Sequence, residues 1–569
     1  MNKLILILLV CVSFTAFGQG DPDTGWTVEY EMQRTVKATK RLNELTQTRD
    51  TIIPIPKIDY PLISLKRETS FQLQNIEPAK IKLFQNNPKL YKHYLKVGIG
   101  SYITPLVQYN FNSGRSRKSN WGVNIDHVSS WLNMKGWAPS TTDNTGARIY
   151  GTLLQNKYQL TGSLDFHNKG FHYYGIPDEN VPGDSINGRF NNIDLNAEWR
   201  TANQDSAKHN FKVGIQYFNY FSFKRKSDTL AKRNGRENFA GLYTGYWYKL
   251  KTETFGVDLD ARYDNYKFGD TDTLMQPDSV MGLKNNNTII NFKPYVISRG
   301  KKYYVKVGLD MAFDIRSKLK FDIFPNVEFA YSMINNTFTP YIGVNGKLKQ
   351  NNFRNLTQEN QYILLSHQQI NEATVFDAYL GFRGHITKEM TFNIMGSFAR
   401  VRNMNLYVND TTYTLGNQFD VVYDTAYIAH VNASLGYQLG EKLRIDVVGD
   451  YFYYIMNNEA YAWNRPDYRI MLSGKYNLSH KLIVGLDLTM EGGRKAKLLT
   501  TDPNALDKNG MKYKKLGFLA DLNLNVEYRW NKRISTFLNL NNLAFQKYQI
   551  WDQYRVQGFQ AMLGATFSF

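Results

Sequence analysis

The sequence has little cysteine and no long apolar run, and each absence excludes a class of protein. Its one cysteine, Cys11, lies near the start of the chain, so the rest can form neither disulfides nor a thiolate site. No segment after the N-terminus offers the run of about 20 apolar residues that a membrane-spanning helix needs. Helical membrane spans and thiol chemistry are therefore excluded.

The first residues have the composition of a secretory signal peptide. Lys3 provides a positive charge, residues 4–12 are apolar, and residues 16–18 form a small-x-small cleavage site before Gln19. A lipoprotein would need a small residue before its cysteine, whereas Val10 precedes Cys11. We expect a signal peptide over residues 1–18.

The composition of the chain favours a membrane barrel. Aromatic residues make up 14% of the sequence, with 39 Tyr and 34 Phe, and the formal net charge is +19. A transmembrane β-barrel needs apolar residues only at every second strand position and carries aromatic belts at both interfaces. Export makes nucleic acid an improbable partner for this positive charge. Anionic lipid headgroups, lipopolysaccharide phosphates or an anion-favouring lumen are the partners we expect instead.

Alternating strands recur from about residue 94 onward. Between residues 254 and 266, Phe255, Val257 and Leu259 share one strand face and Asp258, Asp260 and Arg262 share the other. So dense a charged face cannot pack into a core, but it can line a water-filled lumen while the apolar face meets lipid. The pattern predicts an all-β fold, a large antiparallel transmembrane β-barrel of about 22 strands over residues 94–569. The predicted lumen-facing residues are Asp258, Asp260, Arg262, Arg444, Asp521, Glu527 and Arg529.

Short and long connections alternate along this region. Short turns are expected at 155–157, 249–251, 299–302, 334–336, 387–390, 440–442, 479–481 and 531–533, and long loops at 168–189, 267–287, 350–373 and 493–515. In an outer-membrane barrel the short turns face the periplasm and the long loops face the exterior.

Residues 19–93 differ in character from the barrel. Residues 29–48 suit a charged helix, and the prolines of residues 51–65 suit extended structure outside a ladder. This short irregular segment could lie in the periplasm, thread the lumen or dock on a partner, and the sequence leaves all three open.

The C-terminal stretch NLNNLAFQKYQIWDQYRVQGFQAMLGATFSF resembles the end of TonB-dependent receptors, with an Asn-Asn-Leu step, a following Tyr548 and a last strand that opens on Gly-Phe and ends in Phe. The stretch YLKVGIGSYITPLVQYNFNSGRSRKSNWGVNIDHVSS is similar to the opening of compact barrels of this kind in Bacteroidota-type bacteria. The resemblance covers about residues 94–569. It implies an integral protein of the outer membrane of a Gram-negative bacterium, which passes a solute across that membrane. It also implies that Phe559, Phe567 and Phe569 form the signal that the barrel-assembly machinery reads.

One departure from this family concerns the plug. Its receptors carry a folded plug of well over a hundred residues before the barrel, whereas about 75 residues are present here, too few for a full plug. Residues 34–39, RTVKAT, have a faint likeness to a TonB box, which would pair with TonB by strand addition. The same residues suit an ordinary helix. A non-transporting barrel subunit of an envelope complex is the alternative function.

Several polar motifs contain residue types that occur in catalytic or metal-binding sites. His127 and Ser129 share a strand face, but no nucleophile motif accompanies them, and we expect no enzyme activity. His167 and His172 in an expected loop, and the Asp residues of 270–279, lack the spacing of metal sites, and we expect no metal and no cofactor.

Three basic stretches could lie at loops or turns: GRSRKS (114–119), FKRKS (223–227) and KYKK (512–515). At outer loops they could pair with lipopolysaccharide phosphates. Solvated surface charge is an equal alternative.

Overall fold

The computed structural model describes residues 90–202, 204, 206–222, 234–269, 283–316, 318–334, 337–411, 414–498 and 512–569. Several predictions fall outside these residues: the signal peptide, nearly all of the segment 19–93 with its TonB-box-like stretch, and the stretches 223–227 and 270–279.

Twenty-two strands form one antiparallel sheet. Its first half consists of β1 (His93–Gly100), β2 (Thr104–Asn112), β3 (Ser119–Ser130), β4 (Thr142–Leu154), β5 (Tyr158–His172), β6 (Asn187–Thr201), β7 (His209–Ser222), β8 (Gly235–Leu250), β9 (Glu253–Phe268), β10 (Leu283–Arg299) and β11 (Tyr303–Ile315). The second half consists of β12 (Leu319–Tyr331), β13 (Phe338–Lys349), β14 (Glu372–His385), β15 (Met390–Asn409), β16 (Phe419–Leu439), β17 (Leu443–Met456), β18 (Tyr468–Asn477), β19 (Leu482–Gly492), β22 (Leu519–Arg529), β23 (Ile534–Asn541) and β26 (Gln560–Ser568).

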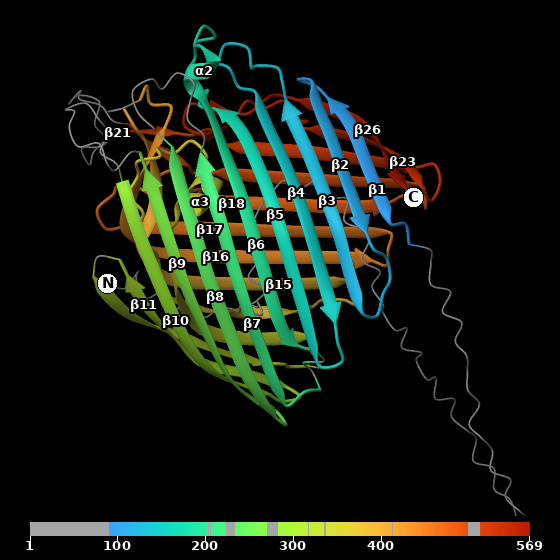
Figure 1. Ribbon diagram of the computed structural model, residues 1–569, viewed down its shortest axis with the longest axis vertical. Coiled ribbons are helices and arrows are strands. Elements are labelled where there is room, and N and C mark those ends of the chain that lie inside the picture. The colour runs from blue at the N-terminus through green and yellow to red at the C-terminus, as the bar shows by residue number, and fades with distance from the viewer. Residues whose placement is uncertain are drawn as a thin grey trace, which may run out of the picture. The chain divides into compact units, whose positions relative to one another are not determined.

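The sheet closes on itself. β1 pairs with β2 on one edge and with β26 on the other, from Tyr94 opposite Ser568 to Gly100 opposite Met562. Closure leaves no free strand edge, which membrane lipid could not tolerate. The prediction of an all-β transmembrane barrel with about 22 strands is confirmed, and Figure 1 shows its slanted strands enclosing the interior.

The remaining elements of the described residues are small. Within these residues, two short helices, α2 (Gly183–Ile186) and α3 (Phe353–Glu359), lie in connections between strands. Two hairpins, β20 (Lys495–Leu498) with β21 (Lys512–Lys515) and β24 (Gln549–Trp551) with β25 (Tyr554–Arg555), stand apart from the barrel sheet. Across the described ranges, no helix is long and apolar enough to span a membrane.

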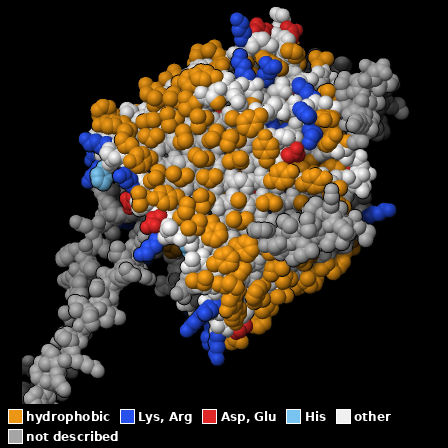
Figure 2. Space-filling model, turned by 180° about the vertical axis from the view of Figure 1, so that it is seen from behind, with side chains coloured by type: hydrophobic (Ala, Val, Ile, Leu, Met, Phe, Trp, Pro, Cys, Tyr) orange, Lys and Arg blue, Asp and Glu red, His pale blue; other side chains and the backbone are white. Residues whose placement is uncertain are grey.

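The outer surface of the barrel is apolar, as alternation requires. On β9, Phe255, Val257, Leu259 and Tyr263 are exposed on the outside, and the residues between them point inward. Figure 2 shows hydrophobic side chains covering the flank of the barrel, with Lys and Arg at the margins of that band. A strand needs about 9–11 residues to cross a membrane. The apolar band therefore corresponds to the membrane-spanning part of the strands.

The strands differ greatly in length. β1 has 8 residues, whereas β15 has 20 and β16 has 21. The long strands continue past the membrane on the side of the long loops, so the expected loops 168–189 and 267–287 are wrong at their ends: β5 reaches His172 and β10 already begins at Leu283. The alternation of apolar residues ends where a strand leaves the lipid, although the hydrogen-bonded ladder of the strand continues. For this reason the sequence pattern predicted loops where the strand ends extend beyond the membrane.

Candidate functional site

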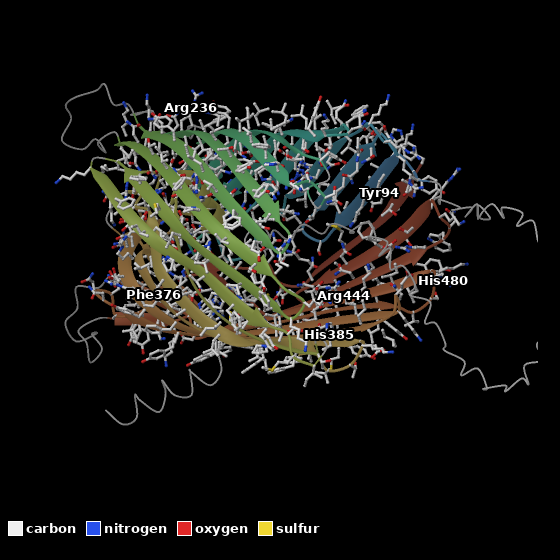
Figure 3. The ribbon with its side chains drawn as sticks, turned by 90° about the horizontal axis from the view of Figure 1, so that it is seen from below. Tyr94, Arg236, Phe376, His385, Arg444 and His480 are labelled. Atoms are coloured by element: carbon white, nitrogen blue, oxygen red, sulfur yellow. The ribbon has the colours of Figure 1, made fainter. Side chains whose placement is uncertain are left out.

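The inner wall of the barrel is polar and its charges are paired. On β9, the Nε of Arg262 donates to Asp260 at 2.7 Å, and the neighbouring carboxylate of Asp258 lies 3.2 Å from the Nζ of Lys212 on β7. These three predicted residues occupy the positions between the outward apolar side chains of β9. Figure 3 looks into the barrel from below and shows the strands enclosing its interior.

The other predicted lumen residues are also paired. Arg444 lies 2.7 Å from Asp446 near a short turn, where its side chain is 65% exposed, and Arg529 lies 3.1 Å from Glu527 on β22. Asp521 accepts a hydrogen bond of 3.0 Å from the amide of Asn523. Most of the predicted lumen positions thus carry ion pairs rather than isolated charges of one sign.

A polar cavity of about 410 Å³ lies against β4 to β8. Its lining includes Arg148, Gln159, Glu198, Arg200 and Tyr243. Arg148 is 3.1 Å from Asp165, and the hydroxyl of Tyr243 donates to Glu198 at 2.9 Å. None of these residues was singled out from the sequence, although their alternation with exposed leucines is the same signal that identified β9.

The connection between β13 and β14, residues 350–371, is here called the inner loop. It contains α3, whose N-cap Asn352 accepts a hydrogen bond of 2.9 Å from the N–H of Asn355. The two carboxylate oxygens of Glu237 on β8 accept from the N–H groups of Phe353 at 2.6 Å and Arg354 at 2.9 Å. Glu237 is 0% exposed. A buried carboxylate thus satisfies the first free amides of the helix and complements its dipole.

Further contacts bind α3 to the same side of the barrel. Arg354 donates to Asp194 on β6 at 2.6 Å and lies over the ring of Phe218 on β7. The hydroxyls of Thr357 and Tyr220 are 2.8 Å apart. Asp194, Tyr220 and Glu237 alternate with outward apolar residues on their strands, so they face inward. The inner loop leaves the wall at β13 and β14 and reaches β6 to β8, several strands away, so it runs through the interior.

The C-terminal end of α3 is held by a half-buried ion pair. Glu359 lies 2.7 Å from Arg465, and Asn405 donates to Glu359 at 3.0 Å. Burial by itself raises the pKa of Glu359, but Arg465 and Lys349 outweigh burial and hold this pKa below its ordinary value. Glu359 is therefore ionised whenever the loop is in place.

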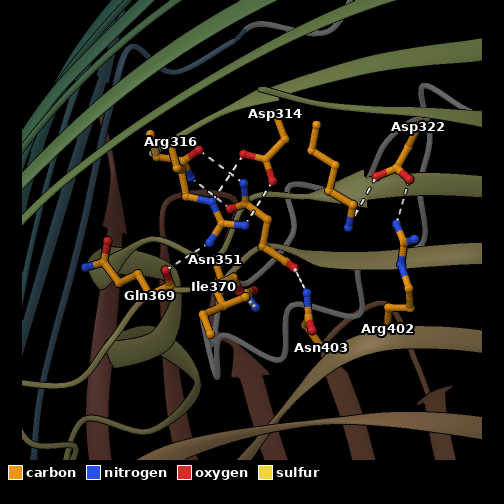
Figure 4. A network of polar contacts seen from close by, with 11 residues as sticks. Asp314, Arg316, Asp322, Asn351, Gln369, Ile370, Arg402 and Asn403 are labelled. Atoms are coloured by element: carbon orange, nitrogen blue, oxygen red, sulfur yellow. Dashed lines mark hydrogen bonds and ion pairs between the residues drawn. The ribbon is translucent and has the colours of Figure 1, made fainter. Parts of the chain in front are cut away.

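Figure 4 shows the base of the inner loop, where polar side chains of the wall hold its backbone. Arg316 donates to the carbonyl of Gln369 at 3.3 Å, and Asn403 donates to that of Asn371 at 3.1 Å. Asn403 sits at a register shift of β15 with φ of 53°, a conformation that Asn tolerates. The bulge turns this side chain toward the loop.

Aromatic and aliphatic residues of several connections meet on the inner loop. Tyr362 stacks on Tyr554 with ring centroids 3.6 Å apart, and the N–H of Leu364 donates to the carbonyl of Phe419 at 2.8 Å. The buried cluster also includes Ala138, Phe171, Tyr173, Ile186, Phe190, Phe218, Tyr220, Phe239, Tyr266, Phe268, Phe353, Leu356, Ile363 and Val421. We call the inner loop, together with the connections 131–141, 173–186 and 542–559 that meet it, the outer cap. An apolar core thus fills the end of the lumen on the long-loop side.

One histidine in the inner loop is buried and uncharged. The Nδ1 of His367 lies 2.6 Å from the carbonyl of Leu364, so Nδ1 carries the proton, and the ring stacks on Phe353. Its Nε2 has no hydrogen-bond partner among the described residues. Burial lowers the pKa of His367 to about 4.

The sequence predicted an outer loop at 350–373 and did not assign it to the lumen. A solvated loop rarely carries as many apolar residues as Phe353, Leu356, Tyr362 and Ile363. That composition is the signal by which its burial could have been found.

The C-terminal residues lie along the closing seam. Phe559 stacks on Phe545, and Phe567 stands opposite Leu95 of β1. The ring of Phe569 stacks on His93 with centroids 4.9 Å apart, and its carbonyl accepts from the N–H of His93 at 3.0 Å. Their role as an assembly signal stays a prediction.

The weaker motifs do not assemble into sites. His127 hydrogen-bonds Thr145 at 2.7 Å, and the hydroxyl of Ser129 has no partner among the residues described, so the two form no dyad. The expectation that His167 and His172 lie in a loop is wrong, because both belong to β5. In the described part of the chain, no group of three or more His, Cys, Asp or Glu residues could hold a metal.

The sequence matches no protein-family model and no curated protein. Solved structures do match the fold. The FrpB iron transporter from Neisseria meningitidis aligns over 85% of this chain and 82% of its own, with a TM-score of 0.64 and 10% identity. The siderophore receptor PirA from Acinetobacter baumannii aligns over 85% and 81%, with a TM-score of 0.62 and 14% identity. The pyoverdine receptor FpvA from Pseudomonas aeruginosa aligns over 85% and 79%, with a TM-score of 0.60 and 10% identity.

These structures are outer-membrane transport receptors rather than enzymes. The chain therefore has the barrel fold of TonB-dependent receptors, as the resemblance of its last strands implied.

Proposed function

We infer that the protein passes a solute across the outer membrane through the lumen of its barrel, and that the inner loop closes this path. The observation that carries the proposal is a closed barrel with a polar, charge-paired wall, across which residues 350–371 are held by contacts to β6, β8 and β11.

The shared fold supports this role. The aligned receptors and transporters handle siderophores or iron, and the same barrel here encloses a cavity that offers both charges, hydroxyls and amides. Because the wall charges are paired, selection by net charge is weak, and a small polar solute with little net charge fits best. The inner loop supplies the closure, because it crosses from β13 and β14 to contacts on β6 and β8.

Swelling of proteoliposomes in isosmotic sugar solutions tests this function. We expect little swelling with the parent protein and clear swelling with Glu237→Ala, which releases α3 from the wall. Swelling absent from Glu237→Ala, in a barrel that still shifts its gel mobility on heating, would refute passage through the lumen. It would favour the role of a non-transporting subunit of an envelope complex.

A further inference from the structure

The end of the barrel with the short turns carries a ring of exposed positive charge. With the exception of 332–337, every turn at this end has at least one exposed Lys or Arg at its tip or in the residues beside it. The exposed cations of this end are Lys92, Arg115, Arg117, Lys118, Lys157, Lys208, Lys251, Lys301, Lys302, Lys388, Lys442, Lys481, Lys532 and Arg533. We call these residues the basic rim. His385 and His480, which Figure 3 labels, lie at two of the same turns.

The cations of the basic rim recur at successive turns with few acids beside them. None of the rim cations forms an ion pair with another described residue, whereas Lys212 of the lumen is paired with Asp258. On the long-loop side, Lys514 is paired with Asp552, but the exposed Lys135 and Lys547 form no ion pair with a described residue. The rim is therefore defined by the recurrence of cations at the turns. Exposed acids at these turns, Glu389 and Glu441, are fewer than the rim cations, so the described turns carry a net positive charge.

An aromatic belt fixes the depth of the basic rim in the membrane. Trp121, Tyr158, Trp199, Tyr303 and Trp530 are exposed on the outside of the barrel close to the short turns. Such belts lie at the level of the lipid headgroups. Because the rim cations follow the belt by only a few residues, their flexible side chains lie in the layer of lipid phosphates.

We propose that the basic rim binds the headgroups of anionic phospholipids in the periplasmic leaflet. The cations surround the barrel rather than gathering on one side, which matches a shell of lipid and not a protein docked on one face. Ammonium and guanidinium groups form charge-assisted hydrogen bonds with phosphate oxygens. The stretch 114–119, considered for lipopolysaccharide, belongs to this rim, because it lies between β2 and β3 at the short-turn end.

Fluorescence quenching in vesicles tests this proposal. The full-length mature protein is reconstituted in phosphatidylcholine that contains increasing amounts of brominated phosphatidylglycerol, and quenching of its tryptophans gives the association constant relative to brominated phosphatidylcholine. We expect a preference for phosphatidylglycerol of at least about twofold at low salt, lost at about 1 M salt because the Debye length there is about 3 Å.

Two sets of substitutions distinguish the contributions of the two ends of the barrel to lipid binding. The rim variant carries Lys301→Gln, Lys302→Gln, Lys481→Gln and Lys532→Gln. The matched control carries Lys135→Gln, Lys284→Gln, Lys515→Gln and Lys547→Gln, which are exposed on the long-loop side. All tryptophans stay in place. We expect the rim variant to lose most of the preference and the control to keep it.

Three results would overturn the proposal: no preference in the parent, full preference in the rim variant, or loss of preference in the control alone. If the parent shows no preference for phosphatidylglycerol but binds a polyglutamate peptide, the partner of the rim is an acidic protein segment instead. None of these results bears on transport, so failure here leaves the proposed function standing.

Discussion

Replacing Glu237 by alanine removes the acceptor for two buried helix amides, and this is the sharpest test of how α3 is held. In the parent, one carboxylate binds the N–H groups of Phe353 and Arg354 at 2.6 and 2.9 Å. Burial raises the pKa of Glu237 to about 7, so its carboxyl group is partly neutral near pH 7. A hydrogen bond to a neutral acceptor contributes about 0.5–1.5 kcal/mol and one to a charged acceptor about 1.5–3 kcal/mol, so the two together stabilise docking by about 1–6 kcal/mol. The released fraction of the inner loop should rise by a factor of about 5 to 10⁴.

The rate of thiol labelling measures the release of α3 from the wall. The sequence has one cysteine, Cys11, in the predicted signal peptide, so Thr357→Cys supplies a single reporter at a position that is 2% exposed. The reporter loses its hydrogen bond to Tyr220 in every variant alike, so the ratio of labelling rates reports Glu237 alone. We expect fast maleimide labelling with Glu237→Ala, intermediate labelling with Glu237→Gln, which keeps one acceptor oxygen, and slow labelling of the parent.

The control is Glu389→Ala, because Glu389 is exposed at the turn between β14 and β15. It should label as slowly as the parent. Equal labelling rates for Glu237→Ala and Glu389→Ala, in barrels that are both folded, would refute the claim that this carboxylate anchors α3.

Arg465→Ala leaves the half-buried Glu359 without its partner at 2.7 Å, and loop docking should weaken by about 1–3 kcal/mol, seen as faster labelling at position 357. Acid acts on the docked loop in two opposite ways. The pKa of His367 is about 4 when the loop is docked and about 6.5 when it is free, so this histidine weakens docking by about 1.4 kcal/mol per unit as pH falls from 6.5 toward 4. Burial raises the pKa of Glu237 to about 7, so protonation of this carboxyl favours the docked loop over the same range. The open probability of the parent in planar bilayers, relative to that of His367→Gln, should therefore rise as pH falls from 6.5 to 4. Asp258→Asn in a Glu237→Ala background removes a negative charge beside Lys212 in the lumen, and reversal potentials should shift toward anion selectivity.

Each of these predictions has a result that contradicts it. Labelling of Arg465→Ala at the parent rate would mean that the ion pair does not hold the loop. An open probability that depends on pH between 6.5 and 4 in the same way in the parent and in His367→Gln would exclude the histidine as an acid-sensitive group. An unchanged reversal potential with Asp258→Asn would show that this pair does not face the conducting path.

The wall of the barrel could be predicted because its rule is local. The alternation of residues with a period of two assigns Phe255 to the outer face and Asp258 to the inner face of their strand, without information from any other part of the chain. The number of strands and the positions of the short turns could be predicted by applying the same two-residue alternation along the chain.

The interior could not be predicted, because its contacts join residues far apart in the sequence. Glu237 meets Phe353 across 116 positions, and nothing near either residue specifies the other. The bulge that turns Asn403 inward depends on how β15 pairs with β16, which a single strand does not encode. Hence the lumen wall was recognised while the loop that crosses it was not.

The most direct test of the account is single-channel conductance of the mature protein beside a variant in which residues 352–370 are replaced by a short Gly-Ser linker. Each is measured with and without residues 19–89, and folding is checked by heat-dependent gel mobility. We predict a silent parent and steady conductance from the loop-replaced barrel lacking residues 19–89. Silence from that barrel, folded and inserted, would contradict the claim that the inner loop closes a polar path through the membrane.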